Sequence, residues 1–215
     1  MFLFDILFPK RCLFCGEVLA KGEKNICLNC YKYFPYKANA EDEYRYKITE
    51  VAFEHLDIFL DYAHCKTPIH KFKYGGYISM GRLLGELWAE HLKEKEWIES
   101  VDCIVPIPLH RNKLYERGFN QSEVLGRVLS KKLGIPIVTN LIERKVNNPP
   151  QITAENRWEN VRDVFVLKKK VDLKDKHIMV IDDVITTSAT TNYFVKTLRG
   201  IKGLKISFAY LSSNY

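Results

Sequence analysis

Long apolar runs are missing from this 215-residue chain. No stretch reaches the roughly 18 apolar residues of a membrane-spanning helix, so the sequence predicts no membrane span. It also has no internal repeat and no low-complexity tract, which excludes repeat architectures. The apolar start, residues 1–9, is interrupted by Asp5 and lacks the basic region and cleavage site of a signal peptide. We therefore expect an N-terminal segment that packs on the protein, and a cytoplasmic location.

Charge of neither sign dominates, although the chain carries 33 Lys and Arg against 26 Asp and Glu, a net charge of +7. The hydrophobic content of 47% and the charged content of 27% are typical of a soluble globular protein. A basic excess suits an anionic partner such as a phosphate ester or a nucleic acid. The alternative is a small basic protein without a polyanionic partner, and charge alone does not separate the two.

The composition divides the chain into three regions. Residues 1–36 hold four of the six cysteines, residues 37–66 are charged and aromatic without a clear period, and residues 67–215 alternate apolar runs with helical periodicity. This alternation predicts an α/β domain with a parallel sheet flanked by helices. The expected helices span 79–92, 121–133 and 189–198, and the expected strands span 101–108, 137–141, 177–181 and 204–211.

The strand-to-helix turn after residue 181 is the most informative segment. Asp182 and Asp183 follow a buried apolar strand, where open α/β sheets place their ligands. A run of small and hydroxyl residues then begins the next helix, where free backbone N–H groups favour an anion. Its members are Thr186, Thr187, Ser188, Ala189 and Thr190.

This turn can bind a phosphorylated sugar. The helix start would hold a phosphate, the two carboxylates would accept hydrogen bonds from a ribose diol, and Mg²⁺ would offset the negative charge. The alternative is structural, with the acids capping a turn and the threonines capping the helix. Caps explain one or two such residues, but not the whole string.

The string from Val180 to Thr190 resembles the signature of type I phosphoribosyltransferases. The resemblance implies that Asp182 and Asp183 contact the ribose of phosphoribosyl pyrophosphate, and that the following loop holds its 5′-phosphate. The family usually has Gly where this chain has Ser188. We therefore expect weaker or altered binding of the phosphate.

Further segments resemble the ComF/GntX branch of this family, the competence protein F-like proteins. They are Pro106-Ile107-Pro108, Arg117 to Gln121, Lys71 to Gly76, and the set Gln151, Arg157, Asn160, Val161 and Phe165. The resemblance covers nearly the whole chain and implies a phosphoribosyltransferase-like sheet with a small N-terminal zinc-binding lobe. It also implies a role in natural transformation, handling incoming DNA with a helicase-like partner.

The segment after the 101–108 strand is a candidate for pyrophosphate binding. If the two strands are parallel, the backbone of Pro106, Ile107 and Pro108 lies at the same sheet edge as the acids. Cations follow at Arg111, Lys113 and Arg117, and Lys71 and Lys73 would add a further basic wall. The alternative is a solvated basic loop.

The cysteine region forms two Cys-x2-Cys pairs, Cys12 with Cys15 and Cys27 with Cys30. This spacing predicts a closed, structural zinc site with four cysteine ligands, and the competing disulfide interpretation is disfavoured in a reducing compartment. Cys103 lies in an apolar strand and is expected in the core.

Aromatic and basic side chains are interleaved in the same lobe. The aromatic residues either stack nucleic-acid bases or dock the lobe on the main domain. The residues are Phe14, Tyr31, Tyr33, Phe34 and Tyr36, beside Arg11, Lys32 and Lys37.

Two functions remain. The first is a protein that binds phosphoribosyl pyrophosphate with Mg²⁺ and handles single-stranded DNA in competence. The alternative is an active phosphoribosyltransferase of nucleotide metabolism. The sequence shows no clear catalytic base and no recognisable hood for the acceptor, so enzymatic activity is not assured by it.

Overall fold

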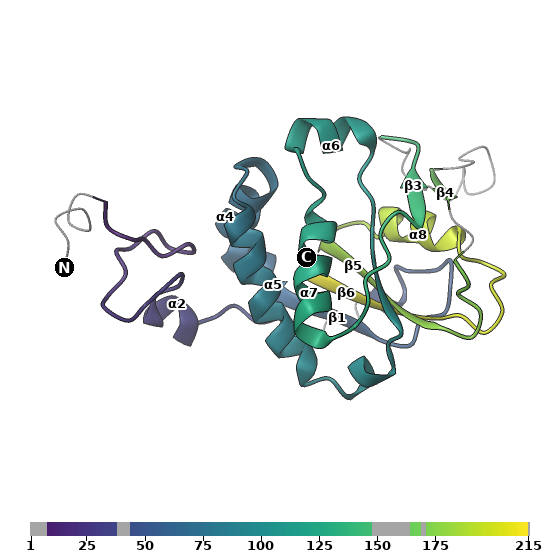
Figure 1. Cartoon of the computed structure of the whole chain (residues 1–215), viewed down its shortest axis with the longest axis horizontal. Coiled ribbons are helices and arrows are strands. Elements are labelled where there is room, and N and C mark those ends of the chain that lie inside the picture. The colour runs from purple at the N-terminus through teal and green to yellow at the C-terminus, as the bar shows by residue number, and fades with distance from the viewer. Residues whose placement is uncertain (1–7, 38–43, 148–163, 169–170, 215) are drawn as a thin grey trace.

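The computed structural model describes residues 8–37, 44–147, 164–168 and 171–214. A small lobe, residues 8–37, lies at one end of a larger α/β body (Figure 1). The lobe contains the short helix α2 (Leu28–Lys32) and is joined to the body by an antiparallel bridge between Tyr36 and Leu60. No helix in the described part of the chain is long and apolar enough to cross a membrane.

A four-stranded parallel sheet forms the centre of the body, in the order β1-β6-β5-β2. The strands are β1 (Leu56–Asp61), β2 (Cys103–Pro106), β5 (His177–Ile185) and β6 (Lys205–Ser213). The apolar run 177–181 lies in the middle of the sheet with both faces covered, as its composition predicts. The strand continues past this run through both acids to Ile185.

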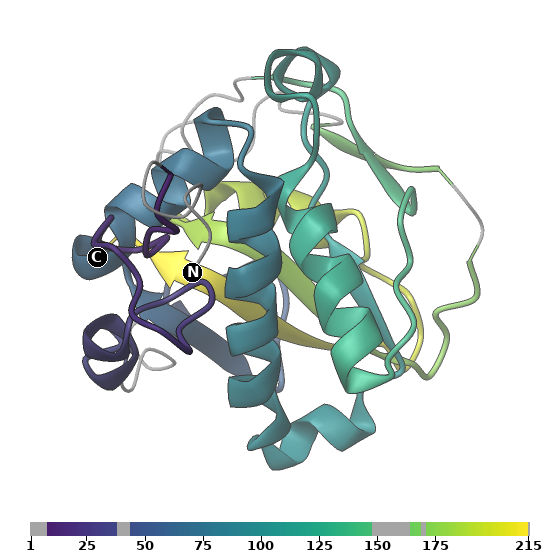
Figure 2. The ribbon, with the colours of Figure 1, turned by 60° about the vertical axis from the view of Figure 1, so that its left-hand side comes forward.

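Helices cover both faces of the sheet (Figures 1 and 2). One face carries α4 (Tyr62–Tyr74), α5 (Ile78–Lys93) and α7 (Gln121–Leu133), and the other carries α8 (Ala189–Lys196). The predicted parallel sheet flanked by helices, with a separate N-terminal cysteine lobe, is confirmed. The three predicted helices are found with their ends within two residues of the expected bounds.

Two apolar cores stabilise these layers. On the α5 face, Leu84 and Trp88 pack with Leu125 of α7 against Met179 of β5. The α8 face buries Phe194 against the aromatic residues of β6. Cys103 belongs to this second core, as expected from its apolar strand.

Two sequence predictions were wrong in detail. Residues 137–141 make a single parallel bridge, between Ile137 and Ile104, because Pro136 has no N–H to extend the ladder. The strand nearby is β3 (Ile142–Arg144), antiparallel to β4 (Phe165–Leu167). The basic segment after β2 is not a loop but a helix, α6 (Arg111–Arg117), ended by Gly118 in the left-handed conformation.

The region without a clear sequence period contributes to the sheet. Its strand β1 pairs with β6, and helix α4 follows β1 directly, with Asp61 capping the helix through Ala63 N–H. The 3-10 helix η1 (Glu96–Ser100) then leads from α5 towards β2.

Candidate ligand-binding site and zinc centre

The two acids lie in the part of β5 that pairs with only one neighbouring strand. Strand β2 ends at Pro106, which pairs with Ile181, and the Ile107 N–H donates to the Ile181 carbonyl at 3.0 Å. Beyond this point β5 pairs only with β6, through Asp182 opposite Tyr210. The acid pair, Asp182 and Asp183, therefore borders an open sheet edge at the carboxyl end of β2.

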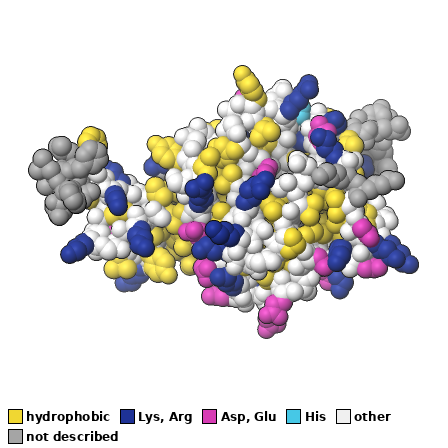
Figure 3. Space-filling model, in the orientation of Figure 1, with side chains coloured by type: hydrophobic (Ala, Val, Ile, Leu, Met, Phe, Trp, Pro, Cys, Tyr) yellow, Lys and Arg dark blue, Asp and Glu magenta, His cyan; other side chains and the backbone are white. Residues whose placement is uncertain are grey.

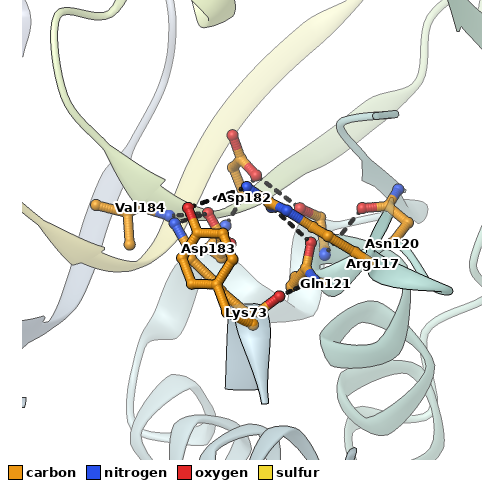
Figure 4. Close-up of polar contacts among 9 residues, drawn as sticks. Lys73, Arg117, Asn120, Gln121, Asp182, Asp183 and Val184 are labelled. Carbon is orange, nitrogen blue, oxygen red and sulfur yellow. Dashed lines mark hydrogen bonds and ion pairs between the residues drawn. The ribbon is translucent and has the colours of Figure 1, made fainter. Parts of the chain in front are cut away.

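Polar groups from two helices meet the acid pair (Figure 4). Lys73 Nζ, at the end of α4, lies 3.0 Å from Asp183 Oδ1, and both side chains are largely buried. From α7, Ser122 Oγ donates to Asp182 Oδ1 at 2.6 Å. The acid pair is thus held by one cation and one hydroxyl before any ligand arrives.

The start of α7 is fixed to the segment that follows β2. Asn120 caps α7 by accepting from Ser122 N–H, and its amide donates to the Ile107 carbonyl at 3.1 Å. Further along, a side chain at Gly126 would collide with Ile181 of β5, so this glycine permits the close approach of helix to sheet. These contacts bring Ser122 within reach of Asp182.

Arg117 and Gln121 join the same network. Arg117 Nη1 donates to Gln121 Oε1 at 3.0 Å, and the Gln121 amide donates to the Lys73 carbonyl at 3.4 Å. The Arg117 guanidinium also lies over the Tyr74 ring, 4.9 Å from its centre. The predicted cations Lys73 and Arg117 therefore lie in one cluster, although they are 44 positions apart in the sequence.

Lys113 and Arg144 complete a cationic wall. Burial, and then the charges of Arg144, Arg117 and Lys73, lower the pKa of Lys113. Burial lowers the pKa of Arg144, which the charge of Asp182 partly opposes. Lys73 and Arg144 thus lie within electrostatic range of the two carboxylates, and Lys113 lies within range of both these cations, of Arg117 and of Glu116. An anionic ligand would offset this concentration of positive charge.

Sequence reasoning missed Ser122 and Arg144. Neither belongs to a motif, because each reaches the site only through packing that joins distant segments. Arg144 is held in place by donating to the carbonyls of Val146 and Asn147 and by lying over the Phe165 ring.

The other predicted residues lie in different parts of the structure. Pro106, Ile107 and Pro108 border the acid pair, whereas Arg111 is exposed at the start of α6, with no hydrogen bond or ion pair to the described cluster. Phe165 packs edge-on against Phe194 in the core. Four predicted residues lie outside the described part of the chain: Gln151, Arg157, Asn160 and Val161.

The loop between β5 and α8 carries the residues predicted to bind a phosphate. Thr186 and Thr187 are exposed, and Ala189 and Thr190 form the first turn of α8. Ser188 precedes the helix at φ 58°, a left-handed conformation that glycine adopts more easily. Its side chain is 3% exposed, and its hydroxyl has no hydrogen-bond partner among the described residues. This hydroxyl is shielded from solvent, so it would donate to an anion bound at the helix N-terminus only after its side chain rotates.

We expect Ser188→Gly to raise the free energy of unfolding by about 1 kcal/mol, because it relieves the left-handed strain and removes a buried, unpartnered hydroxyl. Urea denaturation of the ligand-free protein measures this. Ser188→Ala is the matched control, since it removes the hydroxyl but keeps the strained Cβ, and it should recover only part of the gain. A glycine variant less stable than wild type would contradict the strain argument.

The acid pair gives a second prediction, on pH. Burial, and then the charge of Asp183, raise the pKa of Asp182 to about 6. Folding thus favours the protonated form, so this group's contribution to stability is largest at low pH and is lost as pH rises from about 4 to about 6. We expect Asp182→Asn to stabilise the ligand-free protein more at pH 7.5 than at pH 4.5, measured by urea denaturation. An equal effect at both values would contradict the raised pKa.

The four lobe cysteines form a compact cluster. The Sγ atoms of Cys12, Cys15, Cys27 and Cys30 all lie within 4.8 Å of one another, and Cys15 Sγ is 3.7 Å from Cys27 Sγ. Zn–S bonds of about 2.3 Å place tetrahedral sulfurs about 3.8 Å apart. Backbone N–H groups of Cys27 and Cys30 also point at sulfurs, each at 3.4 Å, which favours thiolates. The cluster fits a structural zinc ion.

Known proteins are similar both to the cysteine lobe and to the α/β body. A family model described as a double zinc ribbon domain matches residues 3–40. Competence protein F of Haemophilus influenzae is 26% identical over 219 residues, covering 93% of this chain and 96% of that protein. DNA utilization protein YhgH of Escherichia coli K12 is 29% identical over 136 residues, covering 60% of this chain and 59% of that protein.

Solved structures of two phosphoribosyltransferases are similar to parts of this chain. Adenine phosphoribosyltransferase from Leishmania tarentolae has a TM-score of 0.42 at 13% identity, covering 73% of this chain and 76% of that one. Purine phosphoribosyltransferase from Pyrococcus horikoshii has a TM-score of 0.39 at 19% identity, covering 61% of this chain and 81% of that one.

Proposed function

We propose that this chain is a member of the ComF family, that it binds phosphoribosyl pyrophosphate with Mg²⁺, and that it handles single-stranded DNA during competence, in the cytoplasm. The observation that carries the ligand proposal is the acid pair, with Lys73 and Arg144 beside it, Arg117 and Lys113 next to these cations, and the N-terminus of α8 following it. The DNA proposal is supported by the names of the relatives, a competence protein and DNA utilization proteins.

Each part of the ligand has chemically suitable residues. Asp182 and Asp183 would accept hydrogen bonds from the ribose hydroxyls, and the loop from Thr186 to Thr190 would hold the 5′-phosphate. Arg117 and Lys113 are placed to meet the pyrophosphate, where a guanidinium can bind phosphate in bidentate fashion.

The acid pair also offers the oxygen ligands that Mg²⁺ prefers. When bound, Mg²⁺ would offset the charge of the carboxylates and of the pyrophosphate. Lys73 makes the ion pair with Asp183 in the ligand-free chain. A metal–ligand complex that uses Asp183 must therefore weaken or replace this ion pair, so Lys73 is a counter-ion that reports on occupancy.

Wild-type protein gives the direct test, by titration calorimetry with phosphoribosyl pyrophosphate, ribose 5-phosphate and pyrophosphate, each with and without Mg²⁺. We expect the complete ligand with Mg²⁺ to bind more tightly than either fragment, because it spans both ends of the site. No heat of binding from the complete ligand would overturn the proposal.

The same site also suits the alternative, an active phosphoribosyltransferase. In that reaction the bond between C1 of the ribose and the pyrophosphate oxygen breaks, the electron pair leaves with pyrophosphate, and a nucleophile bonds to C1. The half-buried cations Lys113 and Arg144 favour this possibility, because they would stabilise charge on the departing group. Release of pyrophosphate that depends on an added acceptor would identify the enzyme.

We further propose that Cys12, Cys15, Cys27 and Cys30 hold a structural Zn²⁺ ion. Four protein ligands close the coordination sphere, so the ion would stabilise the lobe and leave no open position for chemistry. The lobe is then a binding module for DNA or for a helicase-like partner.

A further inference from the structure

A groove separates the zinc lobe from helix α4, and its lining does not include the acid pair. Its volume is about 670 Å³, and its lining includes Phe14, Tyr33, Tyr36, His64, Thr67 and Pro68. The lobe forms one wall, with thiols of the cysteine cluster reaching the surface, and α4 forms the other. The proposed sugar-phosphate site uses none of these side chains.

The aromatic residues of the lobe divide into two sets by their packing. Phe34 is 9% exposed and docks the lobe, with its ring 5.3 Å from that of Phe14 and 5.7 Å from that of Phe59 in β1. Tyr36 belongs to the same set although it is 57% exposed, because its ring lies 5.0 Å from that of Phe34 and 5.6 Å from that of Phe59 and stacks on His91. Tyr33, by contrast, is 68% exposed beside the groove. Docking therefore explains Phe14, Phe34 and Tyr36 but does not explain why Tyr33 presents its ring to solvent.

The charge of the lobe suits a polyanion, although no Lys or Arg lines the groove itself among the described residues. Residues 8–37 contain six Lys and Arg and two Glu, which outweighs the double negative charge that four thiolates would leave on a bound Zn²⁺ ion. Lys32 Nζ lies 5.3 Å from the centre of the Tyr33 ring. Figure 3 shows basic and hydrophobic side chains side by side over the lobe, with little acid between them.

The α4 wall differs in character. Asp61 accepts a hydrogen bond from His64 at 2.8 Å, so this side of the groove carries a carboxylate and a ring nitrogen. A phosphate would be repelled by Asp61, whereas the edge of a nucleobase can use both donors and acceptors. A single strand would therefore follow the basic lobe with its backbone and turn its bases towards Tyr33 and α4.

We propose that this groove binds single-stranded DNA, with an unpaired base stacked on Tyr33 and the backbone on the lobe's basic side chains. The inference rests on the proposed DNA-handling function and adds where and how the strand binds. Single strands are favoured over duplex because stacking on a side chain needs a base whose face is free. Sequence preference should be weak, since every base offers such a face.

Fluorescence anisotropy with a labelled oligothymidylate tests the groove. We expect Tyr33→Ala to raise Kd by about tenfold, in the range that loss of one base–aromatic stack causes. Tyr33→Phe keeps the ring and should bind within about twofold of wild type. Tyr46→Ala is the matched control, because Tyr46 is 86% exposed and belongs to the segment that packs against α8. It should not change Kd.

The possible outcomes distinguish a wrong binding place from a wrong proposed function. If wild type binds the oligonucleotide but Tyr33→Ala binds equally well, the groove is the wrong place and DNA handling stands. If wild type does not bind at all, DNA handling fails, and the inference fails with it. An oligonucleotide carrying photoreactive 4-thiothymidine should cross-link to Tyr33, and cross-links confined to residues outside the groove would also overturn the inference.

Discussion

Replacing Asp182 and Asp183 together by Asn should raise the Kd for phosphoribosyl pyrophosphate with Mg²⁺ by more than about 100-fold. Each carboxylate would accept a charge-assisted hydrogen bond worth about 1.5–3 kcal/mol, and two such losses exceed the ~2.7 kcal/mol that 100-fold requires. Asn keeps nearly the same shape but carries no charge for the metal. Titration calorimetry on the double variant measures the change.

The controls for this variant follow from the contacts of the site. The substitution leaves Lys73 without its counter-ion, so circular dichroism and thermal melting must show an intact fold. Asp102→Asn is the matched control. Asp102 lies at the amino end of β2, whereas the acid pair borders the carboxyl end, and Asp102 makes an ion pair with Lys176. It should leave ligand affinity unchanged. Binding by the double variant within threefold of wild type would place the ligand elsewhere.

Loss of the zinc ion should be the second large effect. Structural zinc sites of this size contribute on the order of 10 kcal/mol to folding, far more than a 30-residue lobe can replace with packing. We expect Cys12→Ser to reduce bound zinc from one ion per chain to nearly none. Limited proteolysis should then cleave within residues 8–37 while the α/β body resists. Metal analysis and mass spectrometry of the fragments measure both results.

Cys103→Ala is the control for zinc binding. Cys103 lies in strand β2, outside the cluster, so this variant should keep its zinc and its protease-resistant lobe. Full zinc content in Cys12→Ser would contradict the four-cysteine centre. A lobe that stays resistant without zinc would instead mean that Phe34 and its aromatic neighbours suffice to hold it.

Local sequence signals predicted the sheet centre and the acid pair well. The apolar run 177–181 and the acids after it are neighbours in the chain, so their placement needs only the strand and the turn. Asn120 and Gly134 likewise mark the ends of α7 as a cap and a left-handed stop.

Features that depend on contacts between distant segments were not visible in the sequence. Strand β1 lies in a region without clear alternation because its residues are buried on both faces beside β6. Arg144 enters the site from a three-residue strand, too short to give a period. Lys73 was predicted as a cation for the pyrophosphate, yet its contact with Asp183 depends on the direction of α4.

Helix α4 extends from one proposed site to the other. The helix has 13 residues and is about 20 Å long. Its first turns carry His64 and Thr67, which line the groove. Lys73, one residue before the end of the helix, makes the ion pair with Asp183. A ligand that binds Asp183 breaks the ion pair that links α4 to β5 through Lys73. The loss of this ion pair can change the position of α4, which forms one wall of the groove. If this changes the affinity for DNA by some factor, thermodynamic reciprocity requires DNA to change the affinity for the sugar phosphate by the same factor.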